Sequence, residues 1–439
     1  MRKILIAIFA LTVALAACAA EPWSVERCMA YAVEHSHAVR QQRYALEESR
    51  ADRTEAIGAF LPSVYGSVSG QMNFGRAIDP STNTYTDVST LYNGYGLSAS
   101  LTIFDGLQRY NELRMARANI AKGQSGLKAE QDDAALKVYK AYMDLVYCQG
   151  AVEQTLRKRG ESQALLHQTE VMAEVGQKSE ADVVQMRATL AADDYEIAHM
   201  QSQTTKAELA LKQLMNYPVA DTLLVVCPAI GDETTGNGSA AEIYSASALT
   251  YPRLMQAQSS VEAARYGLRA ARGQFLPSLS FSAGVSTSFF RNLDHGGHAP
   301  FHEQFENNAG QYIGLSLSIP VFNRLSTVAS VRRRRIALDR AIDNLSHERS
   351  ELQRVIAETL ADIAGSRKEM LKMQEQVAAD SLASHLTARK YEEGLASSID
   401  VRTAAVTLLQ SRVKLLQSRL TLAYNRKLLA YYEGKELWK

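Results

Sequence analysis

Two long stretches of this chain, from about Leu107 to Val175 and from about Ser326 to Glu393, contain no proline. Each covers almost 70 residues, so an unbroken α-helix over either stretch would be about 100 Å long. The second stretch has apolar residues at the seven-residue spacing of a coiled coil. They are Ile342, Ile356, Ile363, Met370 and Val377. Helices of this length exclude a single compact globule and predict an extended coiled coil.

Each long helix is followed by a second helical stretch that would run back beside it. These return helices are expected from about Ser179 to Met215 and from about Ser397 to Tyr432. A glycine lies between the two helices in each case, at Gly176 and at Gly394. Glycine takes positive φ without steric cost and often ends a helix. The sequence therefore predicts two helical hairpins with glycine at their tips.

The two halves of the chain repeat one another. GLSASLTIFDGL from Gly96 matches GLSLSIPVFNRL from Gly314, and AEVGQKSEADV from Ala173 matches YEEGLASSIDV from Tyr391; both offsets are 218 (314 − 96 and 391 − 173). Such a long period indicates a duplicated half-domain rather than a short solenoid repeat. We therefore predict a first repeat at residues 21–218, a connecting segment at 219–246, a second repeat at 247–432 and a C-terminal tail at 433–439.

The first 20 residues predict an export signal. Arg2 and Lys3 precede an apolar run and then small residues, which is the pattern of a secretory signal peptide. The four residues that end at Cys18, LAAC, also fit a lipobox, whereas cleavage after Ala19 or Ala20 would leave no lipid anchor. Both readings place the mature protein outside the cytoplasm.

Geometry favours plain cleavage. A helix that ends at Phe60 would begin near His37, after a break at Ser36, and would rise about 35 Å towards a membrane. The chain from Cys18 to Ser24 extends at most about 20 Å, so a lipid on Cys18 would not easily reach the same membrane.

Four segments of about ten residues alternate between apolar and serine-rich positions. This pattern matches strands that cross a membrane with lipid on one face and water on the other, although a soluble two-sided sheet shows it too. Phenylalanine and tyrosine residues at both ends of the strands resemble interfacial girdles and favour the membrane. The apolar positions are Val64, Val68, Met72, Phe74, Leu97, Ala99, Leu101, Ile103, Leu279, Phe281, Ala283, Val285, Leu315, Leu317 and Ile319.

A Leu-Pro pair precedes the first strand of each half, with the prolines at Pro62 and Pro277. Proline ends a helix because it lacks a backbone N–H, and it is tolerated at the start of a strand. We expect both prolines to mark the point where a helix stops and a strand enters the membrane.

Four strands per chain are too few to close a barrel, which needs about eight. An open sheet would leave unpaired backbone groups in lipid, and each would cost several kcal/mol. The membrane interpretation therefore requires the strands to close with those of other copies of the chain.

The order of these features resembles the TolC-like outer-membrane efflux protein (outer membrane factor) family. The resemblance covers nearly the whole chain and includes LKQLMNYP at Leu211–Pro218. It implies a mixed α and β membrane protein, a homotrimer whose twelve strands form one β-barrel in outer-membrane lipid. The long helices would continue the barrel through the periplasm as an α-helical coiled-coil barrel. The family serves as the exit duct for drug efflux or type I secretion.

Partners are also implied by the resemblance. A periplasmic adaptor protein and an inner-membrane transporter of the RND, ABC or MFS type would dock at the hairpin tips. On this sequence the tips are Val175-Gly176 and Glu393-Gly394, with glutamate in place of the valine in the second.

The family's acidic constriction falls on Asp182 and Asp400. Three copies of an aspartate on a narrow axis would form a ring that attracts cations, and repulsion within the ring would raise the carboxyl pKa values. The alternative is that both residues only cap the return helices. An arginine that some members carry just after the second tip is Ala396 here. We therefore expect Lys178 or Arg402 to form the salt bridges of the closed state instead.

Other features indicate neither catalysis nor nucleic-acid binding. Lys and Arg number 48 against 47 Asp and Glu, without the basic excess of a nucleic-acid binder. No nucleophile–base pair, paired carboxylate cleft or glycine-rich phosphate loop occurs, so we expect neither an enzyme nor a cofactor. His295, His298 and His302 lie in one predicted outer loop and are more simply loop histidines than metal ligands. The remaining alternative function is a periplasmic coiled-coil scaffold without a pore.

Overall fold

The computed structural model of the protein describes residues 22–79, 83–87, 89–227, 239–294 and 299–438. The chain divides into two compact units. The sheet unit consists of Ala45–Gln124 and Gln256–Ser346, and the hairpin unit consists of Met1–Tyr44, Ser125–Met255 and His347–Lys439. Each unit takes segments from both halves of the sequence.

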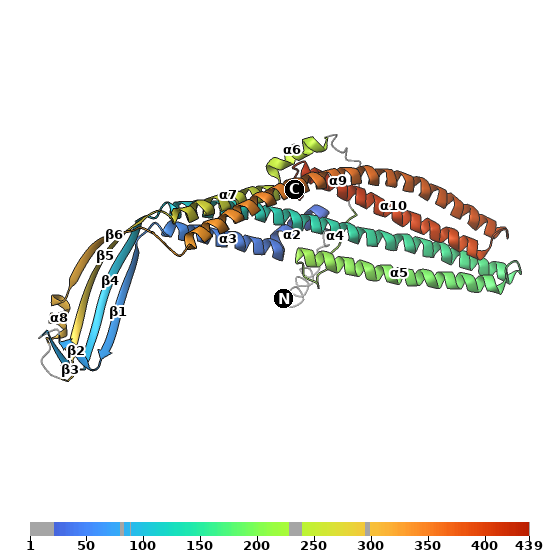
Figure 1. The fold of residues 1–439 in the computed structure, drawn as a ribbon. Coiled ribbons are helices and arrows are strands. Elements are labelled where there is room, and N and C mark those ends of the chain that lie inside the picture. The colour runs from blue at the N-terminus through green and yellow to red at the C-terminus, as the bar shows by residue number, and fades with distance from the viewer. Residues whose placement is uncertain (1–21, 80–82, 88, 228–238, 295–298, 439) are drawn as a thin grey trace, which may run out of the picture. The chain divides into compact units, whose positions relative to one another are not determined.

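A four-stranded antiparallel sheet dominates the sheet unit (Figure 1). Its order is β1-β4-β5-β6, so β1 and β6 are the edge strands. The two central strands are 15 residues long, longer than the sequence pattern indicated, while all four strands contain the predicted segments. The strands are β1 (Ser63–Asn73), β4 (Thr90–Phe104), β5 (Ser278–Asn292) and β6 (Gly310–Ser318).

Apolar side chains on this sheet are exposed to solvent in the single chain. Val68 is 78% exposed on β1, and Ile313 is 81% exposed on β6. Leu97 pairs with Val285 across β4 and β5, so apolar residues face each other in register. A continuous exposed apolar surface of this kind marks a face that meets lipid or protein rather than water.

Two small additions to the sheet unit were not predicted. Strands β2 (Arg76–Asp79) and β3 (Thr84–Asp87) form a separate antiparallel pair. Helix α8 (Phe301–Asn307) lies along β5, where the Gln304 side chain accepts from the Phe290 N–H and donates to the Phe290 carbonyl, both at 2.9 Å. The amide of Gln304 therefore continues the strand's hydrogen bonding through a side chain.

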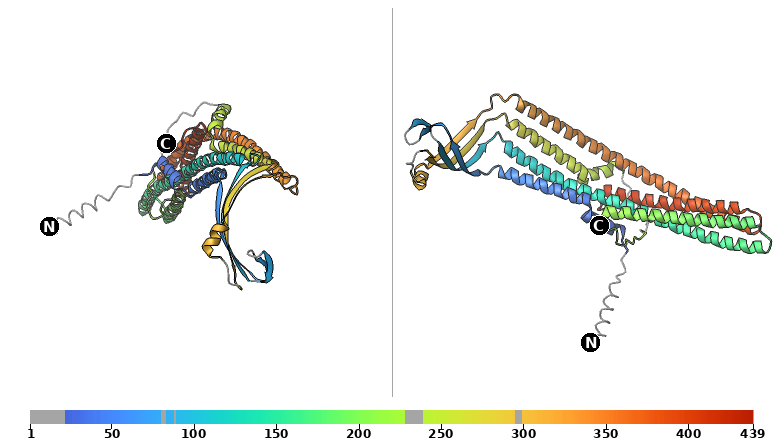
Figure 2. Two further views of the ribbon diagram at one scale, coloured as in Figure 1. Left: turned by 90° about the vertical axis from the view of Figure 1, so that its left-hand side faces the viewer. Right: turned by 90° about the horizontal axis from the view of Figure 1, so that it is seen from below.

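Parts of four helices lie side by side in the sheet unit, in the order α9, α7, α4, α3 (Figure 2, right). The order follows that of the strands to which they connect. Two of the helices are short, α3 (His37–Gly58) and α7 (Pro252–Gly273), and two are long, α4 (Gln108–Glu174) and α9 (Ser326–Glu392).

Glycine is required where α4 and α7 meet the sheet. A Cβ on Gly106 would lie 2.3 Å from the carbonyl oxygen of Gly273, and Gly106 has a φ of +70°. Pro62 directly precedes the first residue of β1, and Pro277 directly precedes the first residue of β5. Each proline thus follows a helix and opens a strand, at matching places in the two halves.

The predicted hairpins form the hairpin unit. Helix α4 is followed by α5 (Glu180–Met215), and α9 is followed by α10 (Ser398–Tyr432). Both long helices contain 67 residues, which corresponds to about 100 Å of helix axis. Their bounds lie within one residue of those predicted from the sequence. Among the described residues, no helix has the length and apolar character required for a membrane span.

The core of the hairpin unit gathers around Tyr142 of α4, whose side chain is completely buried. Its hydroxyl donates to the carbonyl of Trp23 at 2.9 Å and accepts from the Val226 N–H at 3.0 Å. One side chain thereby fixes both the segment before α2 (Val25–His35) and the segment that follows α5. The break between α2 and α3 falls at Ser36, as predicted.

The connecting segment and the C-terminal end also pack into the hairpin unit. Helix α6 (Ala240–Thr250) begins with a capping box between Ser239 and Glu242. Leu437 is only 2% exposed and belongs to the same core as Tyr142. The order of helices and strands repeats as the sequence matches indicated, while the repeat boundaries themselves stay a prediction.

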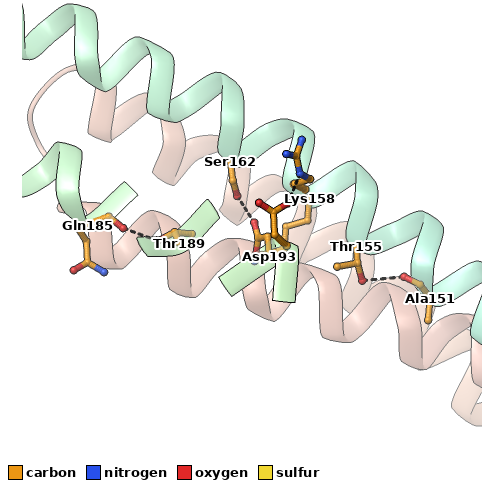
Figure 3. A network of polar contacts seen from close by, with 9 residues as sticks. Ala151, Thr155, Lys158, Ser162, Gln185, Thr189 and Asp193 are labelled. Atoms are coloured by element: carbon orange, nitrogen blue, oxygen red, sulfur yellow. Dashed lines mark hydrogen bonds and ion pairs between the residues drawn. The ribbon is translucent and has the colours of Figure 1, made fainter. Parts of the chain in front are cut away.

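A buried ion pair joins α4 and α5 (Figure 3). The Lys158 ammonium contacts Asp193, and Ser162 donates to the other carboxylate oxygen of Asp193 at 2.7 Å. The Lys158 and Asp193 side chains are 9% and 4% exposed. At the equivalent positions the second hairpin has Gln376 and Ser411 (158 + 218 and 193 + 218), so it lacks the pair.

We predict that Lys158→Ala destabilises the first hairpin by about 3–5 kcal/mol, because the change leaves the buried Asp193 carboxylate without its cation. Arg159, one residue further along α4, forms an exposed ion pair with Asp194 at 2.6 Å. Arg159→Ala should therefore cost no more than about 1 kcal/mol. Urea unfolding followed by the helical circular dichroism signal compares the two variants, and equal losses would contradict the prediction.

Candidate functional site at the tips of the helical hairpins

Both hairpins turn at a glycine with positive φ. The first tip, Val175–Lys178, has Gly176 at φ +77°, and the second tip, Glu393–Ala396, has Gly394 at φ +79°. A Cβ on either glycine would meet nothing within 4 Å, so the left-handed backbone rather than lack of space calls for glycine.

The two tips share one hydrogen-bond pattern. At the first, the Gly176 N–H donates to the Ala173 carbonyl at 3.0 Å and the Gln177 N–H to the Met172 carbonyl at 2.8 Å. At the second, the corresponding bonds run from Gly394 to Tyr391 at 3.1 Å and from Leu395 to Lys390 at 2.7 Å. This is the Schellman motif, which satisfies the last carbonyls of a helix.

A capping box begins each return helix. Ser179 accepts from the Asp182 N–H at 3.2 Å, and the Asp182 carboxylate accepts from the Ser179 N–H at 3.2 Å and from its hydroxyl at 2.7 Å. Ser397 and Asp400 make the same three contacts, at 3.2, 2.9 and 2.7 Å. Both aspartates therefore do cap the return helices, which was the alternative to their role in a constriction.

The capping bonds lower the carboxyl pKa of both aspartates within one chain. For Asp182 the main cause is the hydrogen bond from the Ser179 hydroxyl, with smaller contributions that include the charge of Lys178. For Asp400 the main cause is the hydrogen bond from Ser397. The sequence led us to expect repulsion between three converging copies, which would oppose this lowering in the assembled trimer.

The two tips are joined through Tyr391, which is 1% exposed. Its hydroxyl lies 3.1 Å from the Thr169 hydroxyl of α4, and the Lys178 ammonium lies 3.8 Å from the centre of its ring. Ser398, the first residue of α10, also contributes to the lowered pKa of the Asp182 carboxyl. Lys178 thus contributes to the contact between the tips through a cation–π contact, while the salt bridge expected for Lys178 in the closed state stays a prediction.

A cavity of about 290 Å³ lies behind the tips, among the four hairpin helices α4, α5, α9 and α10. Met186 and Val401 supply apolar lining, and Arg402 and Glu392 supply charge at its margin. Within the described part of the chain Arg402 has no ion-pair partner, so the salt bridge expected at Arg402 does not occur in a single chain.

Sequence reasoning missed Tyr391, Thr169 and Ser398. Tyr391 was noted only as a marker of the repeat, three residues before Gly394. An aromatic residue there, where the first half has Ala173, was the one available signal of a contact specific to the second hairpin. Thr169 and Ser398 carried no signal, because their partners lie on the other hairpin.

The other candidate residues are the loop histidines and Cys18. His302 lies on α8, exposed, with its Nε2 3.3 Å from a Glu306 oxygen. His295, His298 and Cys18 lie outside the described residues. In the described ranges no group of histidine, cysteine and acidic side chains could hold a metal ion.

An amphipathic sheet with two free edges and a pair of long capped hairpins defines a subunit of a membrane channel. A model of the outer membrane efflux protein family matches residues 30–217 and 243–432, which is most of the chain. The chain belongs to this family. Its members are channels of the outer membrane that extend into the periplasm, not enzymes.

Curated relatives agree with the family. The chain is 20% identical over 350 residues to the outer membrane efflux protein BepC of Brucella suis, covering 80% of this chain and 72% of BepC. It is 23% identical over 396 residues to the cation efflux system protein CusC of Escherichia coli strain K12, covering 88% of this chain and 81% of CusC.

Solved structures share the fold. A crystal structure of CusC superposes with a TM-score of 0.81 at 18% identity, over 94% of this chain and 92% of that one. The outer membrane protein VceC of Vibrio cholerae superposes with a TM-score of 0.77 at 17% identity, over 94% and 96%.

Membership of this family favours the channel over the other function considered from the sequence, a periplasmic coiled-coil scaffold without a pore. The chain forms the outer-membrane exit duct of a tripartite efflux system and works with an adaptor and an inner-membrane transporter. Its fold is that of a trimeric β-barrel continued by an α-helical barrel. Each chain contributes four strands to the β-barrel.

We predict that the first turns of α5 and α10 stay capped from neutral pH down to about pH 4. The folded-state pKa of Asp182 and of Asp400 is lowered, so the capping contribution is present above the ordinary carboxyl pKa. It is lost as the pH falls through the lowered value. Amide hydrogen exchange at these turns, measured by mass spectrometry on the trimer, follows the loss.

The matched control for this prediction is Ser179→Ala with Ser397→Ala, which at every pH removes the hydroxyl groups that accept from the Asp182 and Asp400 N–H. Its first turns should exchange fast already at neutral pH. A wild-type transition well above pH 4 would contradict the prediction and would show that repulsion between copies outweighs the caps.

Proposed function

We propose that the two tips form the docking surface for the periplasmic adaptor. The observation that carries this proposal is the recurrence of one tip backbone in both hairpins, at Gly176 and Gly394, with the same two hydrogen bonds. Both tips also expose an apolar side chain, since Val175 is 67% and Leu395 is 73% exposed. A partner that recognises backbone shape and a small apolar contact would find both at each tip.

We further propose that Asp182 and Asp400 form the acidic constriction at the periplasmic entrance. Their lowered pKa values keep both carboxyl groups ionised at neutral pH within one chain. Three copies would bring six carboxylates to one end of the helical barrel, and rings of acidic side chains favour cations in pores. The capping role and the constriction role are compatible, because the cap fixes the carboxylate at the start of the helix.

The Tyr391 contacts would hold the entrance closed in this proposal. Thr169 and Lys178 of the first hairpin reach Tyr391 of the second, so separation of the hairpins breaks both contacts at once. The inner-membrane partner would be an RND, ABC or MFS transporter. Crosslinking at Val175 or Leu395 in cells, followed by mass spectrometry of the captured proteins, would identify the adaptor and then its transporter.

We predict that Asp182→Asn with Asp400→Asn weakens cation selectivity and block by multivalent cations added from the periplasmic side. Asparagine keeps the carbonyl oxygen of the capping box and removes only the charge. Helix content and trimer yield should therefore stay unchanged. Single-channel recording in planar bilayers measures both properties, and unchanged selectivity together with unchanged block would leave the two residues as helix caps alone.

We predict that Gly176→Asn with Gly394→Asn abolishes efflux while the trimer still reaches the outer membrane. Asparagine tolerates positive φ, so the turn keeps its shape while a side chain is added to the docking surface. Efflux is scored by substrate accumulation in cells, and trimer by unboiled gel electrophoresis of outer membranes.

Gly160→Asn with Gly365→Asn is the matched control, since a Cβ on either helical glycine also meets nothing within 4 Å. The control pair should retain efflux. Loss of trimer in the tip variant would reduce both tip glycines to a structural role, and normal efflux in that variant would exclude the tips as the docking surface.

A further inference from the structure

The helix layer of the sheet unit has two free flanks. Contacts between neighbours fix its order: Leu46 of α3 lies against Gly123 of α4, where an added Cβ would be 3.0 Å from the leucine side chain. A Cβ on Gly267 of α7 would lie 3.3 Å from Met115 of α4 and 3.9 Å from the Arg334 guanidinium of α9. Helices α3 and α9 therefore each have one side with no neighbour among the described residues.

Acidic residues gather on the free side of α3. Leu46 marks the side that faces α4, and each residue turns the helix by about 100°. Glu48, Asp52 and Glu55 lie about 200°, 240° and 180° around the axis from Leu46, so they point away from α4. All three are exposed.

The basic residues of the same helical segment lie on the other side. Arg50 and Arg53 lie about 40° and 340° around the axis from Leu46, towards α4. Between Ala45 and Gly58 the free side of α3 therefore carries only negative charge.

Helix α9 presents the opposite charge on its own free flank. Arg334 reaches back over α7, and Arg332 is rotated by about 200° from it, so Arg332 points away from the layer. Arg333 and Arg335 flank Arg332 on either side of the helix, and all are exposed. The acids of α9 begin only at Asp339, about 10 Å further along the axis from Arg332.

These opposite charges lie at the same depth below the sheet. Asp52 is six residues from the end of α3 (58 − 52), and Arg332 is six residues from the start of α9 (332 − 326), which is about 9 Å in both cases. Gly267, which contacts both neighbours, is likewise six residues from the end of α7 (273 − 267). Met115 of α4, which lies against Gly267, is seven residues from the start of its helix (115 − 108), so helices of this layer touch at nearly equal depth.

The strand order brings the two flanks together between copies. Helix α3 leads into edge strand β1, and edge strand β6 leads into α9. If β6 pairs with β1 of the next copy to close the barrel, α9 comes to lie beside α3 of that copy. Within its own chain, none of the six charged residues Glu48, Asp52, Glu55, Arg332, Arg333 and Arg335 has an ion-pair partner among the described residues.

We propose that the free flank of α9 forms ion pairs with the free flank of α3 in the next copy. The arginines are Arg332, Arg333 and Arg335, and the acids are Glu48, Asp52 and Glu55. The seam is heterologous, with α9 of one copy against α3 of its neighbour, as a closed ring requires. It also prevents wrong pairing, because two α3 flanks or two α9 flanks repel one another. The proposal rests on the trimeric fold and is independent of the proposed roles of the tips.

Charge reversal tests the seam. The triple change of Arg332, Arg333 and Arg335 to Glu should lower the trimer fraction severalfold, and so should the triple change of Glu48, Asp52 and Glu55 to Arg. All six changes in one chain should restore the trimer, because every seam then carries the reversed pair. Unboiled gel electrophoresis and size-exclusion chromatography in mild detergent measure the trimer fraction.

The control is a triple variant on the central helix α7 with the same change of charge. It replaces Arg265, Arg269 and Arg272 by Glu and should remain trimeric. Because a triple variant can fail to fold, cysteine pairs supply a second measurement in a background with serine at the native cysteines. Arg332→Cys with Asp52→Cys should crosslink copies on oxidation, whereas Arg332→Cys with Arg50→Cys should not. Failure of the six-residue swap to restore trimer, or crosslinking at position 50 and not at 52, overturns the proposal.

Discussion

The assembly of this protein depends on backbone hydrogen bonding along its edge strands, β1 and β6. The edge strands have 11 and 9 residues, and each presents a row of N–H and C=O groups beyond the four-stranded sheet. In lipid each unpaired group costs several kcal/mol, so the sum over both edges exceeds the stability of a typical domain. Because the edges must pair between copies, the strand order also decides which helices meet between copies.

Local chemistry, by contrast, shapes the tips without help from other copies. A Schellman motif ends each long helix and a capping box starts each return helix, so orphan backbone groups on both sides of the turn find partners within a few residues. The same carboxylates that satisfy these groups also carry the charge of the proposed constriction. The start of each return helix and the charge at each tip therefore depend on one pair of serine and aspartate side chains in each hairpin.

Much of this fold could be predicted because its signals are local or periodic. Proline-free stretches indicated the long helices, and the Leu-Pro pairs indicated where the short helices α3 and α7 meet the strands. The partner of Tyr391 could not be predicted, because Thr169 lies 222 residues away on another helix. Helix α8 was missed because seven residues carry too little periodicity, and its anchor is the Gln304 amide on a strand backbone. The buried pair of Lys158 and Asp193 is likewise invisible without the hairpin's register.

The duplicated tips give the closed trimer two symmetries at once. In backbone shape its periplasmic end has six equivalent turns, because Gly176 and Gly394 adopt the same conformation. In side chains it has only three equivalent pairs, since Val175 and Lys178 of one tip stand where the other has Glu393 and Ala396. A partner that recognises main-chain shape can occupy six places on this ring, whereas a partner that recognises side chains can occupy three.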